Sequence, residues 1–188
     1  MTERIEVGLI ALLGFLVGAG VTYLYNISLE QRKTQKEKAN LAKLLLADIE
    51  TLWNRYYQVL GKSIEEHTDS LNPLFLTFYA NQNYFIVFDA NAAKIGMFEG
   101  EVAAKIVKLY TLAKALIDGI NEYEKLCDNY IELRKYPETD IESLNIDDKS
   151  KRILSTMQYI FPIIQAEHNN LKVLVNEVKE ILESISKK

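Results

Sequence analysis

Hydrophobic and polar residues follow two different patterns along this chain, and the first is a run without charge. Residues 7–27 read VGLIALLGFLVGAGVTYLYNI. A helix of this length rises about 31 Å, which matches the roughly 30 Å hydrocarbon core of a bilayer. We therefore expect a short N-terminal tail over residues 1–6 and a transmembrane helix over residues 7–27.

A cleavable signal peptide is the alternative for this segment, because Gly18-Ala19-Gly20 resembles a small-residue cleavage site. Signal peptides begin with a basic segment, however, and this leader carries two glutamates and one arginine. The apolar run also continues past the small residues to Ile27. An uncleaved anchor fits this pattern better.

The second pattern is a seam, a set of hydrophobic residues spaced alternately three and four apart. Such spacing places side chains on one face of a helix, and helices with one apolar face pack side by side. Three long segments carry a seam: Ala42, Leu45, Ile49, Leu52, Tyr56 and Val59; Val102, Ile106, Leu109, Ala113, Leu116, Ile120, Tyr123, Cys127 and Tyr130; Leu154, Met157, Phe161, Ile164, His168, Leu171, Val175, Val178, Leu182 and Ile185.

Residues 72–96, between the first two seams, are less regular. Asn72-Pro73 predicts the start of a helix, with Asn72 as the N-cap and Pro73 as the first helical residue. We expect a broken helix that completes the bundle. A strand over residues 84–88 is the alternative, because a short aromatic run is ambiguous by periodicity alone.

The third seam has its own boundary signals. Residues 136–148 contain Pro137 and five carboxylates, which predicts an exposed acidic connection. Asp147 and Asp148 stand in N-capping range of the helix that follows. Pro162 lies inside the seam and predicts a kink.

The predicted fold class is all-α, with an N-terminal transmembrane helix followed by an antiparallel bundle of about four helical elements with coiled-coil-like seams. An up-down-up-down path would return the C-terminal lysines toward the membrane. Heptads alone do not specify which helices pair, so a homodimeric coiled coil remains open.

The chain that follows the apolar run has two parts of opposite net charge. Residues 28–45 hold five basic and two acidic side chains and predict a basic juxtamembrane helix, whereas residues 46–188 predict an acidic helical bundle domain. Before the apolar run the one basic side chain is Arg4. Because basic residues that flank a span are retained on the cytoplasmic side, we expect the N-terminus outside and the bundle in the cytoplasm. The candidate contacts for anionic lipid are Arg32, Lys33, Lys36 and Lys38.

Small residues share one face of the apolar run. Ala11, Gly14 and Gly18 lie three and four apart, and the GxxxG formed by the two glycines would let two backbones approach closely. This face is a candidate for self-association, which would make the protein a homo-oligomer. The plainer interpretation is that glycine is frequent in membrane helices.

One stretch resembles a known pattern. The string YFIVFDAN at residues 84–91, followed by Ile95-Gly96 and by residues 106–110 and 112–118, is similar to a pattern in uncharacterised small bacterial membrane proteins with a single N-terminal span. The resemblance implies a helical cytoplasmic domain and no particular activity. From the residues themselves, Asp89 and Asn91 are typical turn and cap residues, and the functional interpretation is a recognition spot with Tyr84 and Phe88.

No motif in the sequence specifies a reaction. We find no Glu-x-x-His pair, HExxH motif or Gly-rich phosphate loop, and the one cysteine lies on a seam, so we expect no catalytic residue, cofactor or metal. His168 is the exception of interest. It lies on the third seam, where it needs a hydrogen-bond partner, and is either a satisfied core histidine or a pH-sensitive element.

These patterns predict a non-enzymatic, single-pass protein of the inner membrane that holds a protein-interaction or scaffolding bundle at the cytoplasmic face. The expected partners are membrane lipid and a protein; nucleic acid is excluded because the bundle is acidic. One alternative is an outward-facing sensor that binds a small ligand near Pro162 and His168. Another is a defence or toxin effector whose glycine-bearing span perturbs the bilayer.

Overall fold

Every element that the computed structural model describes is helical, which confirms the predicted all-α class. The structure describes residues 2–69, 72–76, 84–135 and 140–187, with the backbone alone for residues 2–14, 16 and 140–145. In chain order the elements are α1 (Thr2–Tyr56), the π-helical turn η1 (Tyr57–Gly61), α2 (Lys62–Glu66), α3 (Ile86–Asn91), the 3-10 turn η2 (Ala92–Met97), α4 (Gly100–Arg134) and α5 (Asp140–Ser186).

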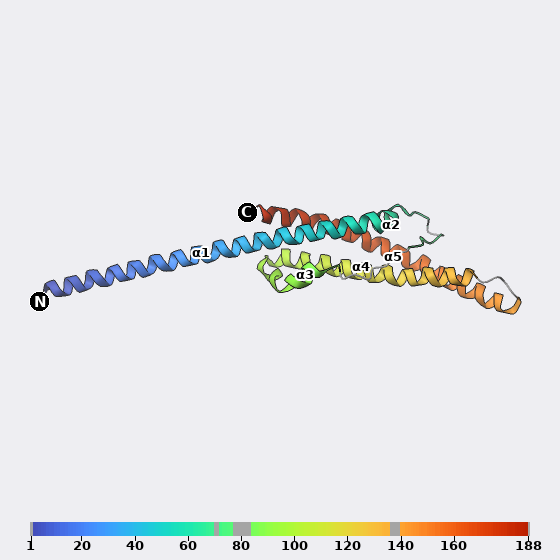
Figure 1. The fold of residues 1–188 in the computed structure, drawn as a ribbon, viewed down its shortest axis with the longest axis horizontal. Helices are drawn as coiled ribbons and strands as arrows, with labels where there is room; N and C mark the ends of the chain where they lie inside the picture. The colour runs from blue at the N-terminus through green and yellow to red at the C-terminus, as the bar shows by residue number, and fades with distance from the viewer. Residues whose placement is uncertain (1, 70–71, 77–83, 136–139, 188) are drawn as a thin grey trace.

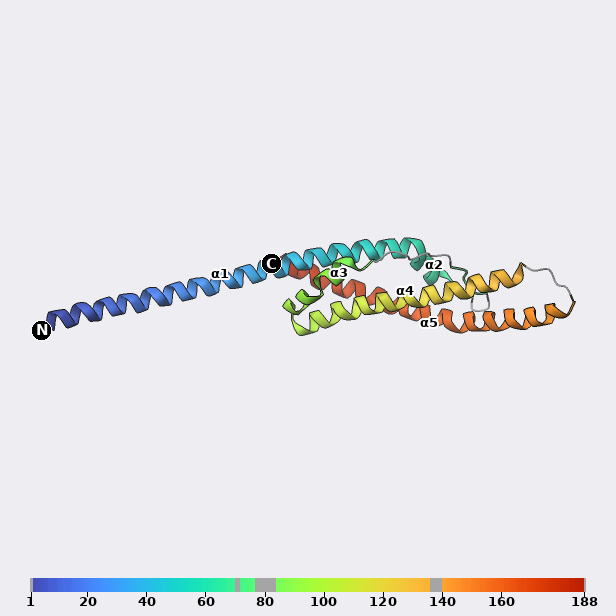
Figure 2. The same ribbon diagram turned by 60° about the horizontal axis from the view of Figure 1, so that its bottom comes forward.

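The long helices α1, α4 and α5 form an elongated bundle (Figures 1 and 2). α5 runs antiparallel to both of the others and packs against each of them. The N-terminal half of α1 projects far beyond the bundle, and the C-terminal end of α5 lies beside the middle of α1 (Figure 2). Leu41 is the first buried residue among the described side chains of α1, so the bundle begins there.

The seams of α4 and α5 are buried, as the spacing predicts, and the two helices pack against each other. Ile106, Leu116 and Ile120 of α4 and Met157 and Ile164 of α5 are almost completely buried. Full burial of such a side chain contributes about 1.5–3 kcal/mol, so these two seams provide much of the stability of the bundle. α5 continues through Pro162 without ending.

The seam of α1 follows the prediction only as far as Tyr56. Val59 was predicted to face the core and is exposed, whereas Leu60 and Ile64 are buried. The π-helical turn η1 causes this difference, because its wider i to i+5 bonding accommodates one extra residue and moves the apolar face on by one position.

The expected helix start at Asn72-Pro73 is wrong. The Asn72 side chain donates to Asp69 Oδ2 at 2.7 Å, and residues 73–76 are not helical. The alternative strand over 84–88 is also wrong, because α3 begins at Ile86. The segment between α2 and α4 was expected to form the second helix of the up-down-up-down path. In the part of this segment that the structure describes, the helical elements are only the short α3 and η2.

The acidic connection before α5 is shorter than predicted. α5 begins at Asp140, so Asp147 and Asp148 are not N-caps but lie inside the helix. The Asp147 carboxylate forms an ion pair with Lys151, one turn later, at 2.6 Å. Residues 136–139 of the predicted connection lie outside the described part of the chain.

The predicted membrane span is described only in part. Within the described residues, no helix has a stretch that is both long and apolar enough to cross a bilayer. The side chains of residues 7–14, including Ala11 and Gly14, lie outside the description. At Gly18 an added Cβ would meet nothing within 4 Å, so its face of α1 is open.

Gly119 is helical, and the seam of α4 stays in phase across it, as predicted. An added Cβ would make only an ordinary contact, 3.9 Å from Glu167 Oε2. We expect Gly119→Ala to raise the free energy of unfolding by about 0.5–1 kcal/mol, because alanine loses less backbone entropy in a helix. Urea denaturation of the two proteins measures this difference, and a loss of stability would contradict it.

Candidate functional site

The turn η1 brings aromatic side chains against the middle of α5. Gly61, the last residue of η1, is buried. A Cβ at this position would lie 3.1 Å from His168 Cε1 and 3.0 Å from Tyr57 Cδ2, closer than side chains normally pack. The absence of a side chain at Gly61 therefore makes room for the imidazole of His168.

His168 lies within an aromatic shell and is completely buried. Its ring stacks on Trp53 at a centroid distance of 5.8 Å and on Tyr57 at 6.4 Å. Its Nδ1 atom is 2.8 Å from the hydroxyl of Tyr56, near the end of α1. We call these four residues together with Glu65 the histidine cluster.

The hydrogen bonds of the cluster indicate one tautomer of His168. Burial raises the pKa of Tyr56, so its hydroxyl stays protonated and can donate to Nδ1. Nε2 then carries the proton of the neutral ring. This atom is buried without a hydrogen-bond partner in the described residues, and the nearest acidic oxygen is Glu65 Oε2, at 3.8 Å.

Glu65 is held ionised beside the ring. Hydrogen bonds from Lys172 Nζ at 2.6 Å and from the Tyr57 hydroxyl at 3.0 Å lower the pKa of its carboxyl. Desolvation lowers the pKa of His168, the Glu65 charge raises it, and the Lys172 charge lowers it again. Because desolvation is the largest of these effects, the folded protein holds His168 in its neutral form.

The ring of His168 is closed to solvent, so a charge on it would not be hydrated. A proton on the ring would place a charge in the core, with Glu65 as its compensating anion. Among the described residues, no group of three or more His, Cys, Asp and Glu side chains is placed to hold a metal ion.

We expect stability to fall as the pH drops below about 6.5, the ordinary histidine pKa that applies in the unfolded chain. The lowered pKa in the folded state means that the unfolded chain binds the proton first, so this stability is present above pH 6.5 and is lost toward the folded pKa. One histidine contributes at most about 1.4 kcal/mol per pH unit.

Urea denaturation between pH 5 and pH 8 measures this slope. His168→Gln should flatten it between about pH 5 and 6.5. His67→Gln, which changes the chain's other histidine, should retain it because His168 is still present. An unchanged slope in His168→Gln would contradict the assignment.

The predicted recognition spot lies where α3 joins its neighbours. Phe88 stacks on Tyr110 of α4 at 4.0 Å, and Asp89 forms an ion pair with Lys114 at 2.8 Å. Asn91 ends α3, and its side chain donates to the Val87 carbonyl at 2.8 Å. Each of these side chains thus has a partner within the chain.

Tyr84, the fourth residue of this spot, lies in the turn before α3. The guanidinium carbon of Arg55 is 5.4 Å from the centre of its ring. Tyr84 therefore faces α1, whereas Phe88 and Asp89 face α4.

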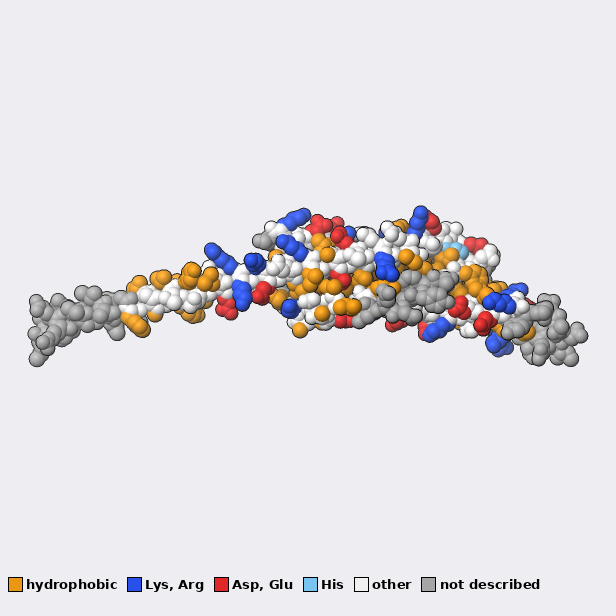
Figure 3. Space-filling view, in the orientation of Figure 1, with side chains coloured by type: hydrophobic (Ala, Val, Ile, Leu, Met, Phe, Trp, Pro, Cys, Tyr) orange, Lys and Arg blue, Asp and Glu red, His pale blue; other side chains and the backbone are white. Residues whose placement is uncertain are grey.

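The four predicted lipid-contact residues lie on α1 just before the bundle; we call them the basic collar: Arg32, Lys33, Lys36 and Lys38. Arg32 and Lys36 border an open hollow that they share with Lys187, from the end of α5. Lys38 lies 6.0 Å from the centre of the Phe98 ring. Figure 3 shows basic side chains where the projecting part of α1 meets the bundle.

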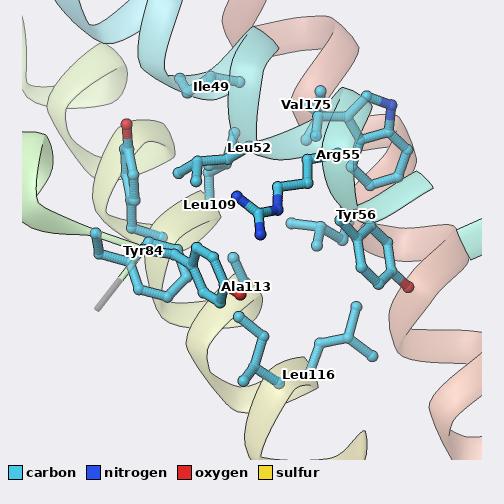
Figure 4. Close-up of a pocket in the computed structure, with 14 residues that line it drawn as sticks. Ile49, Leu52, Arg55, Tyr56, Tyr84, Leu109, Ala113, Leu116 and Val175 are labelled. Atoms are coloured by element: carbon cyan, nitrogen blue, oxygen red, sulfur yellow. The ribbon is translucent and has the colours of Figure 1, made fainter. Parts of the chain in front are cut away.

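An apolar pocket lies beside the histidine cluster and was not predicted. It has a volume of about 70 Å³ and is bordered by α1, α4, α5 and the turn before α3 (Figure 4). Trp53 and Tyr56 belong both to the pocket wall and to the histidine cluster. Arg55 lines the same pocket and is exposed to solvent on its outer side.

Comparison of the chain with protein-family models, with curated proteins and with solved structures gave no match.

Proposed function

We propose that this chain is a membrane-anchored helical bundle that acts as a non-enzymatic protein-interaction module at the cytoplasmic face of the inner membrane. The observation that carries this proposal is the apolar surface on the projecting part of α1. Phe15, Val17, Val21 and Leu24 are between 63% and 73% exposed. Scattered apolar residues on a surface need no explanation, but a continuous apolar surface marks contact with a membrane or a protein.

A membrane explains this surface better than a protein groove does. A groove-binding helix is apolar on one face, whereas residues 7–27 are uncharged all round. Tyr23 and Tyr25, at the end of the run, are placed as interfacial aromatics. The basic collar follows within three turns and would lie at the level of anionic headgroups.

The bundle offers surface of its own for a protein partner. Tyr159 and Ile163 lie one turn apart on α5, and both are exposed. Aromatic and aliphatic side chains of this kind anchor protein interfaces. The cluster around His168 supports a structural rather than a catalytic role, because its histidine is closed to solvent.

Membrane topology tests the proposal. A reporter active only in the cytoplasm is fused after the C-terminus, and a reporter active only outside is fused there in a second strain. Activity of the cytoplasmic reporter alone is expected, because the basic collar is retained on that side. Activity of the external reporter alone would contradict the proposed orientation.

Ligand sensing by the helical domain is the second candidate. The apolar pocket favours it, because largely apolar pockets with few polar groups are typical small-molecule sites. An outward-facing bundle in the topology experiment would make this the leading function.

A further inference from the structure

We propose that the apolar pocket binds a small anionic amphiphile, a carboxylate with a short apolar tail. The tail would lie in the pocket between α1, α4 and α5, and the carboxylate would meet Arg55. This site goes beyond the protein-interaction function proposed above and does not depend on the orientation of the bundle in a membrane.

The interior of the pocket matches an apolar tail. Leu52, Leu109, Leu116 and Val175 contribute aliphatic walls, and Trp53 contributes an aromatic one. Protein cores are normally close-packed, and an unfilled apolar space costs stability because its lining atoms lack partners. Apolar cavities remain dry and bind small apolar molecules. A tail in this space would regain those contacts.

Arg55 carries the positive charge that would pair with the carboxylate of the ligand. Of the described residues that line the pocket, it alone carries a formal charge. In the view of Figure 4 its guanidinium group is directed toward the space framed by Leu52, Leu109 and Ala113. The guanidinium carbon lies 5.4 Å from the centre of the Tyr84 ring, a cation–π contact, and the group carries five N–H donors.

The same geometry favours a carboxylate over other head groups. A planar guanidinium matches one carboxylate through two parallel N–H···O bonds. A cationic head group would be repelled by Arg55, and a neutral one would gain no ion pair. The volume of about 70 Å³ is well below that of sites for drug-sized ligands, so the tail must be short.

Binding can be measured by the fluorescence of Trp53, because it is the chain's one tryptophan and lines the pocket. The full chain is placed in phosphatidylcholine vesicles, and its fluorescence is titrated with butanoate, 1-butanol and butylammonium. We expect a saturable change with butanoate at a concentration about three- to tenfold lower than with 1-butanol, and none with butylammonium. If the chain does not bind to the vesicles, the same titration is carried out on the chain in solution. A failure of the membrane-anchor proposal is then distinguished from a failure of the ligand proposal.

Two variants test the site. Ala113→Phe places a ring in the pocket and should abolish the saturable change, with the melting temperature as a check on folding. Arg55→Gln, on the exposed rim, should make butanoate bind no better than 1-butanol, while Arg152→Gln, exposed on α5, should bind butanoate as the original protein does. Equal responses to the three compounds, or an unchanged butanoate response in Arg55→Gln, would overturn the proposal.

Discussion

Gly61→Val is expected to lower the free energy of unfolding by about 2–4 kcal/mol, since overpacking a close-packed core forces side chains or backbone to move. Even a Cβ would lie 3.0 Å from Tyr57 and 3.1 Å from both His168 and Tyr56. His168 packs against both tyrosine rings, and all three rings pack against Trp53, so there is little room for any of them to move. Urea denaturation monitored by circular dichroism measures the loss.

Gly100→Val is the matched control for this substitution. A Cβ at Gly100 would meet nothing within 4 Å, so its stability should change by less than about 0.5 kcal/mol. Similar losses for the two variants would mean that the effect comes from replacing a glycine and not from the contact with the histidine cluster.

If residues 7–27 anchor the chain as proposed, the double substitution Val17→Asp and Val21→Asp should move the protein from the membrane fraction to the soluble fraction. Val17 is the central residue of the run 7–27, where a charged side chain costs about 2.5–3.5 kcal/mol of insertion free energy. Both valines project from α1, at 64% and 63% exposure, and lie outside the bundle core. Fractionation of cells after an alkaline carbonate wash measures the redistribution.

Val173→Asp provides the control with the same change of side chain. Val173 is 59% exposed, but it lies on α5 within the bundle region. Its substitution should leave the distribution between fractions unchanged. If the double variant and this control remain equally in the membrane pellet, the anchor does not reside in residues 7–27.

The long helices could be predicted because their signals are local. The seam over residues 102–130, with spacings of three and four, determines which face of α4 is buried, whatever that face contacts. The same spacing placed His168 in the core. Its partner could not be predicted, because Tyr56 lies 112 residues away in the chain.

The failures of prediction have equally specific causes. At the end of α1, Val59 and Leu60 are both apolar, so composition does not show that η1 shifts the seam from one to the other. The Asn72 side chain donates a hydrogen bond to Asp69 and does not cap a helix. The apolar pocket joins segments remote in sequence, and no local pattern indicates it.

The unbroken course of α1 has a mechanical consequence. Leu41 lies fourteen positions after Ile27, so a bundle anchored through residues 7–27 would stand about 21 Å from the end of the span. A flexible linker would not transmit a tilt or rotation of that span to the bundle, whereas a continuous helix would. In a chain anchored in this way, torque on the N-terminal half of α1 would reach its last turn, where Trp53 stacks on His168 and the Tyr56 hydroxyl lies 2.8 Å from its Nδ1.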